Sequence, residues 1–142
     1  ALCVGVPCGA IAAVYRRGAT DVGLMAAATV GIAVPNFVFA GVSILLFSFY
    51  WKVFPPAGWG SLEQLVLPSI CLGLPYAAYI ARLTRTGMLD VLGQDYIRTA
   101  RAKGLSETWI VMRHAAPGAM LPVVSFLGPA VANILSGSLI VE

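Results

Sequence analysis

Two long stretches without a charged residue constrain this chain most, one from Val22 to Tyr50 and one from Pro117 to Val141. About 20 apolar residues in a helix suffice to cross the hydrocarbon core of a bilayer. Only 11% of the 142 residues are charged and 59% are hydrophobic, whereas about 25% of residues in a soluble domain are charged. A soluble domain of this composition would lack the polar groups to cover its surface. We therefore expect an integral membrane protein.

Two shorter apolar runs complete the pattern, at residues 1–15 and 65–80. The first is too short to cross a bilayer and begins without an initiator Met, so we expect the cut end of a span in a fragment of a longer protein. The sequence thus predicts an all-α, polytopic transmembrane helical bundle, with residues 1–142 forming a single, partial domain.

The basic residues orient these spans. Lys52 alone lies near the second connection, at 51–63, and the other eight of the nine basic residues lie in the first connection or the third: Arg16, Arg17, Arg82, Arg85, Arg98, Arg101, Lys103 and Arg113. Alternate loops face the same side of a membrane, and the side rich in Lys and Arg is the cytoplasm. We expect 16–21 and 85–116 to be cytoplasmic and 51–63 external, with Tyr50, Trp51 and Trp59 at the outer interface. The net charge of +3 then reflects topology and not nucleic-acid binding.

Four prolines interrupt the apolar runs: Pro35, Pro75, Pro122 and Pro129. Each removes a helix hydrogen bond, so we expect the helices to bend or break there. In a bilayer the freed carbonyl groups need protein or water beside them. Pro35, Asn36 and Asn133 are therefore candidates for a substrate pathway. Packing kinks, with the Asn side chains bonded to a neighbouring backbone, are the alternative.

The polar segment 85–116 carries helical patterns. An apolar stripe of Leu89, Leu92, Tyr96 and Ala100 faces a polar stripe of Asp90, Gln94, Arg98 and Arg101. Gly104 suits the position just after a helix, where a left-handed conformation costs glycine little. Ser106 suits the N-cap of a second helix. The segment is expected to form a helix, a glycine turn and a helix, which could either rest on anionic lipid or dock on a cytoplasmic partner.

The residues "DYIRTARAKGLSETWIVMRHAAPGAMLPVV" resemble the cytoplasmic signature loop of ABC importer permeases, of the form E-A-A-x3-G-x9-I-x-L-P. Ala100, Gly104 and Pro117 match the second Ala, the Gly and the final Pro. The departures are Arg98 for Glu, Thr99 for the first Ala, His114 for Ile and Ala116 for Leu. "LPYAAYIARLTR", "PPAGWGS" and "GVPCGAIAAVYRRG" are similar to the dipeptide/oligopeptide and nickel branch, so the resemblance covers essentially the whole chain.

This resemblance implies a permease subunit in the inner (plasma) membrane that spans about four of the family's six helices and has a coupling loop at about 85–116. It implies a second permease subunit, two cytoplasmic ATP-binding subunits, an extracytoplasmic substrate-binding protein and membrane lipid as partners. Di- or oligopeptides are the implied substrates; nickel, another small solute or secondary transport are the alternatives. The residues implied to contact the ATP-binding subunits are Asp95, Tyr96, Arg98, Thr99, Ala100, Arg101, Lys103, Gly104, Leu105 and Pro117.

The sequence contains no motif for chemistry of its own. It lacks a G-x-x-x-x-G-K-[ST] phosphate loop. His114 is the sole histidine, and Cys3, Cys8 and Cys71 form no metal-binding pattern, so we expect no catalytic residues, metal or cofactor. The apolar runs at 22–50 and 117–141 lack the ionisable residues that a proton-coupled transporter needs, which disfavours the secondary-transporter alternative.

Overall fold

The computed structural model describes residues 1–55, 58 and 60–141, with side chains described as far as residue 134. The described residues contain helices and no strand, which confirms the all-α prediction. In chain order the elements are α1 (Leu2–Val14), α2 (Ala19–Ala33), α3 (Asn36–Ile44), the π-helix η1 (Leu45–Tyr50), α4 (Leu62–Leu92), α5 (Asp95–Ala102), α6 (Glu107–Ile110), the π-helix η2 (Val111–Ala115) and α7 (Ala116–Val141).

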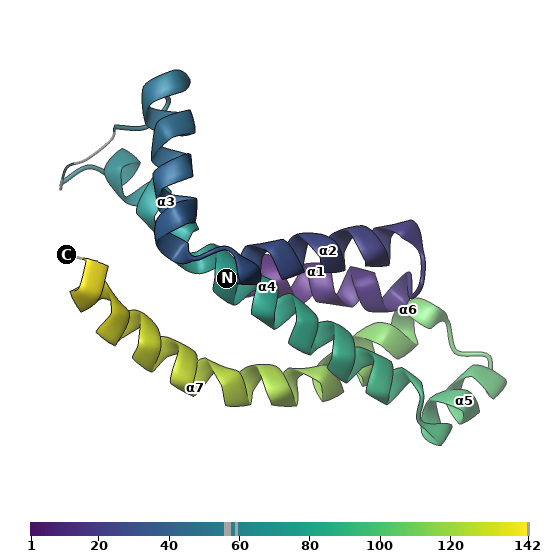
Figure 1. The fold of residues 1–142 in the computed structure, drawn as a ribbon. Helices are drawn as coiled ribbons and strands as arrows, with labels where there is room; N and C mark the ends of the chain where they lie inside the picture. Colours follow the sequence, from purple (N-terminus) through teal and green to yellow (C-terminus); the bar gives the residue numbers. More distant parts are fainter. Residues whose placement is uncertain (56–57, 59, 142) are drawn as a thin grey trace.

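Helix α4 is the central element, because α1, α2, α3 and α7 all pack against it (Figure 1). It starts with a capping box, in which the backbone N–H of Ser61 donates to the side chain of Gln64 at 3.2 Å. The expectation that a connection begins soon after the third apolar run, at about residue 82, is wrong. The helix continues to Leu92, so Arg82 and Arg85 lie on α4 and not in a connection.

Helix α1 packs against α4 through glycines. A Cβ atom on Gly5 would lie 2.6 Å from the carbonyl oxygen of Ala77. One on Gly9 would overlap the carbonyl oxygen of Ala81 and lie 2.7 Å from Cβ of Thr84. Small residues at such positions let two helix backbones approach closely in a membrane. Side chains larger than hydrogen therefore have no room at this contact.

The second apolar run is divided into two helical segments. Helix α2 and the α3–η1 segment meet at an angle of 100° (Figure 1). Val34 is extended (φ −77°, ψ 124°), the conformation that a following proline imposes, and Pro35 is the N-cap of α3. Pro35 thus breaks the helix as predicted. By contrast, α4 continues through Pro75, and α7 continues through Pro122 and Pro129 with a visible curve.

The last span begins earlier than predicted. Helices α6, η2 and α7 follow one another without a break, and residues 107–134 form one apolar helix long enough to cross a bilayer. Pro117 therefore lies inside a helix instead of at the start of a span. Helix α4 is the second helix of sufficient length, and the bent α2–α3–η1 pair would be a third. The described residues are thus consistent with a fragment of a polytopic helical membrane protein.

Candidate functional site

The loop between α4 and α7 carries most of the residues predicted to meet a partner. Helix α4 ends at Leu92, and α5 starts anew at Asp95 after a turn at Gly93. This break shifts the helical register, so the predicted stripe is wrong at one position. Tyr96 is 51% exposed, and Ile97 is fully buried in its place. Ile97, Ala100 and Ile110 form a small core that fastens α5 to α6.

The turn between α5 and α6 has the geometry predicted from its glycine. Gly104 adopts a φ of +81°. Its N–H donates to the carbonyl of Arg101 at 2.9 Å, and the N–H of Leu105 donates to that of Ala100 at 3.3 Å. These two bonds define a Schellman motif, which satisfies the last carbonyls of α5. Ser106 caps α6, because its Oγ accepts the N–H of Trp109 at 3.3 Å. Both local predictions are confirmed.

An ion pair that sequence reasoning missed bridges this turn. Arg101 Nε lies 2.5 Å from Oε1 of Glu107, and Nη2 lies 3.2 Å from Oε2. The neighbouring carboxylate raises the pKa of the Arg101 guanidinium above its usual value. Both side chains are exposed, so the pair adds little stability. Its two parallel bonds connect the end of α5 to the start of α6.

The outer face of α5 is charged and open. The side chains of Asp95 and Arg98 are 94% and 76% exposed and form a weak ion pair at 3.3 Å. The Thr99 hydroxyl donates to the carbonyl of Asp95 at 3.1 Å, and the ring of Tyr96 stands edge-on to that of His114 at 6.2 Å. Of the residues predicted to contact a partner, Pro117 lies in α7. The others all lie on α5 or in the turn that follows it: Asp95, Tyr96, Arg98, Thr99, Ala100, Arg101, Lys103, Gly104 and Leu105.

The candidate pathway residues lie at two places. Pro35 and Asn36 lie at the break between α2 and α3. Asn36 lines a groove of about 540 Å³ that runs between α3 and α4, where its neighbours include Ala40, Leu67 and Cys71. The groove is mostly apolar. Asn133 lies in α7 and does not line it. Trp59, predicted to lie at the outer interface, falls outside the described residues.

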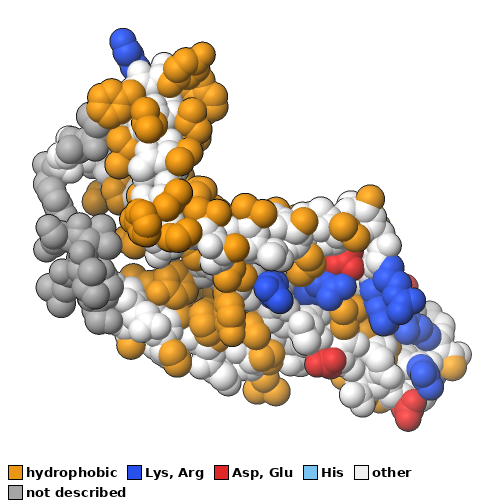
Figure 2. Space-filling view, viewed as in Figure 1, with side chains coloured by type: hydrophobic (Ala, Val, Ile, Leu, Met, Phe, Trp, Pro, Cys, Tyr) orange, Lys and Arg blue, Asp and Glu red, His pale blue; other side chains and the backbone are white. Residues whose placement is uncertain are grey.

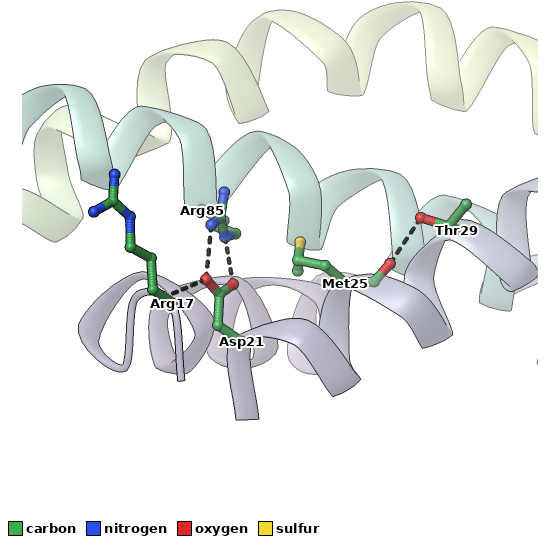
Figure 3. Close-up of polar contacts among 5 residues, drawn as sticks. All are labelled: Arg17, Asp21, Met25, Thr29 and Arg85. Atoms are coloured by element: carbon green, nitrogen blue, oxygen red, sulfur yellow. Dashed lines mark hydrogen bonds and ion pairs between the residues drawn. The ribbon is translucent and has the colours of Figure 1, made fainter. Parts of the chain in front are cut away.

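A second polar contact was also missed, and it joins α2 to α4. The carboxylate of Asp21 accepts bonds from Nε and Nη2 of Arg85 at 2.6 and 2.8 Å, and one from the backbone N–H of Arg17 at 2.9 Å (Figure 3). Asp21 is only 3% exposed. We predicted both residues to be loop charges. Figure 2 shows Lys and Arg side chains gathered on this face, toward the end that carries α5.

No cluster for metal-dependent chemistry occurs within the described ranges. No group of three or more His, Cys, Asp or Glu side chains is positioned there to hold a metal ion. Cys3, Cys8 and Cys71 are free thiols. Among the described residues, charged side chains form three ion pairs: Arg85–Asp21, Arg98–Asp95 and Arg101–Glu107.

Comparison with known proteins gives a consistent result. The family described as binding-protein-dependent transport system inner membrane component matches residues 5–142. The chain is 47% identical over 138 residues to the dipeptide transport system permease protein of Bacillus subtilis, covering 97% of this chain and 45% of that protein. It is 42% identical over 144 positions to the oligopeptide transport system permease protein of Escherichia coli, covering 100% and 47%. A glutathione transport system permease protein of Escherichia coli is 43% identical over 142 residues, covering 100% and 46%. The chain spans about half the length of these relatives.

Proposed function

Because this chain belongs to the binding-protein-dependent transport system inner membrane components, we propose that it forms part of the substrate path of an ATP-driven importer. Di- or oligopeptides are the proposed substrates, since two of the relatives above are named for dipeptide and oligopeptide transport. Nickel or another small solute is the alternative. The chain would hydrolyse no ATP itself and would act with a second permease subunit, two cytoplasmic ATP-binding subunits and an external substrate-binding protein.

The observation that carries the coupling role is the position of the loop. The apolar run of α4 ends near Ile80, but the helix continues to Leu92, about 18 Å further at about 1.5 Å per residue. The loop thus stands at the end of a helical stalk. A helix that rests on lipid needs no stalk, because its apolar face must reach the headgroups. The stalk therefore favours docking on a cytoplasmic protein over the lipid alternative.

The shape and surface of the loop support the same proposal. Ile97, Ala100 and Ile110 point inward and hold the two short helices together. Asp95 and Arg98 point outward and are free to meet another protein. The Schellman turn and the Arg101–Glu107 pair give the loop one defined form. A rigid, charged projection of this kind suits a groove on a partner subunit.

The connections of the loop provide a route for movement. Its first end continues into α4, and its second end continues without a break into α7. Both helices are long enough to cross a bilayer. A partner that pulls or tilts the loop would therefore move two membrane-spanning helices together. We propose that this movement, driven by ATP binding to the partner subunits, opens and closes the substrate path.

Substitution of Gly104 tests the coupling role. A Cβ atom there meets nothing within 4 Å, so a substitution acts through the backbone alone. Valine at positive φ costs on the order of 1–2 kcal/mol, whereas asparagine adopts this conformation more readily. In the full-length permease, we expect Gly104→Val to insert normally but to lose co-purification with the ATP-binding subunits and substrate-stimulated ATP hydrolysis. Gly104→Asn should retain both. Normal coupling by a fully assembled Gly104→Val complex would refute the proposed role.

A further inference from the structure

Helix α2 packs against α4 and α1, but few of its side chains are buried. Of its residues only Asp21 and Ala28 are buried. A Cβ atom on Gly31 would lie 3.4 Å from Cβ of Ala78, which is an ordinary contact, and one on Gly23 would meet nothing within 4 Å. Helix α1, by contrast, sits so close to α4 that no Cβ fits at Gly9. Of the two buried residues, Asp21 is the one that forms hydrogen bonds to α4.

The Asp21–Arg85 pair has the geometry of a fixed joint. The guanidinium presents Nε and Nη2 to the two carboxylate oxygens, an arrangement that defines both distance and orientation. The same carboxylate accepts the N–H of Arg17, which adopts a left-handed φ of 62° in the turn between α1 and α2 (Figure 3). One buried side chain thus binds the turn, the start of α2 and the last third of α4.

The joint lies between the loop and the bend. Arg85 precedes the end of α4 at Leu92 by about 10 Å along the helix. At its other end, α2 leads directly into the 100° bend at Pro35. A displacement of the cytoplasmic end of α4 would reach α2 through this pair, because it is the ion pair that joins the two helices.

We propose that Asp21 and Arg85 are positioning residues, which transmit movement of the coupling loop from α4 to α2 and so to the bend at Pro35. This inference rests on the proposed transport function. The pair does not touch the loop or the groove at Asn36, and it acts through the helices that carry them. Its loss should therefore uncouple ATP hydrolysis from import without preventing either ATP-binding subunit from docking.

The chain contains a matched control for this proposal. Arg82 lies one turn before Arg85 on α4 and lines the same groove of about 500 Å³, together with Asp21, Met25 and Thr29. It takes part in none of the ion pairs found among the described residues. Arg82→Gln therefore removes the same charge from the same helix face and leaves the joint intact.

The test measures import and ATP hydrolysis separately in vesicles that contain the full-length permease with its partner subunits and dipeptide as the probe. Asp21→Asn and Arg85→Gln should assemble and hydrolyse ATP, but the amount imported per ATP should fall about tenfold, within the usual range of coupling between sites. The double variant should fall no further than either single variant, because both remove the same joint. Arg82→Gln should resemble the wild type.

The results that would contradict the inference are as specific as those that would support it. Wild-type import per ATP in the two neutral variants overturns the inference. If the neutral variants do not assemble, Arg85→Lys decides the question. It keeps the charge but loses the two-bonded geometry, so its import per ATP should lie below that of the wild type, and an unchanged ratio overturns the inference. Wild-type protein that imports nothing would instead refute the proposed function.

Discussion

The glycine contact between α1 and α4 predicts different effects for the same substitution at two sites, Gly9 and Gly23. An alanine at Gly9 would place its Cβ against the carbonyl oxygen of Ala81 and 2.7 Å from Cβ of Thr84. Carbon atoms pack best at about 3.5–4.0 Å, so α1 must move away from α4 by about 1 Å. Such overpacking typically costs about 1–3 kcal/mol. At Gly23, where a Cβ meets nothing, no such cost arises.

Both glycines lie within helices, so alanine improves helix propensity at each site by about 1 kcal/mol. The difference between the two variants therefore isolates the packing cost. We expect Gly23→Ala to raise the free energy of unfolding, and Gly9→Ala to lie about 1–3 kcal/mol below Gly23→Ala. The measurement is reversible unfolding of the full-length permease in mixed micelles. Equal stability of the two variants would show that α1 does not approach α4 this closely.

Two further predictions concern orientation and charge. In a background without the native cysteines, an impermeant thiol reagent added outside intact cells should label Val53→Cys and not Ser106→Cys, and labelling at 106 would reverse the predicted topology. If Arg98 contacts an acidic surface on an ATP-binding subunit, Arg98→Glu should weaken co-purification of the complex at low salt. The defect should shrink as salt is added, because salt screens exposed charge pairs. A defect that does not depend on salt would contradict an electrostatic contact.

The features predicted correctly from sequence depend on neighbouring residues. The positive φ of Gly104 follows from a glycine after an amphipathic helix, and the cap at Ser106 follows from its place before the next helix. The break at Pro35 is equally local, since proline restricts the residue before it. Apolar length and composition were enough to predict the all-α membrane class. The roles of these residues in coupling remain predictions.

The features not predicted from sequence depend on residues distant in sequence, on the exact end of a helix, or on packing that outweighs a local helix breaker. Asp21 and Arg85 are 64 positions apart, and each resembles an ordinary charge at the end of a span. The apolar stripe predicted from sequence includes Tyr96 because it assumes one continuous helix through Gly93. The helix ends there, and the next helix has a different register. Pro75 does not break α4, since packing against the surrounding helices offsets the lost hydrogen bond.

The uninterrupted helix from Glu107 to Ile134 is a long lever arm attached to the loop. At about 1.5 Å per residue it is about 40 Å long, more than the roughly 30 Å of a hydrocarbon core. If this helix were tilted by about 10° about its start at Glu107, its far end would swing by about 7 Å, which exceeds the height of one helical turn. If a partner docks on the loop as proposed, rearranging a few contacts there would shift the far end of this helix by more than the width of a side chain.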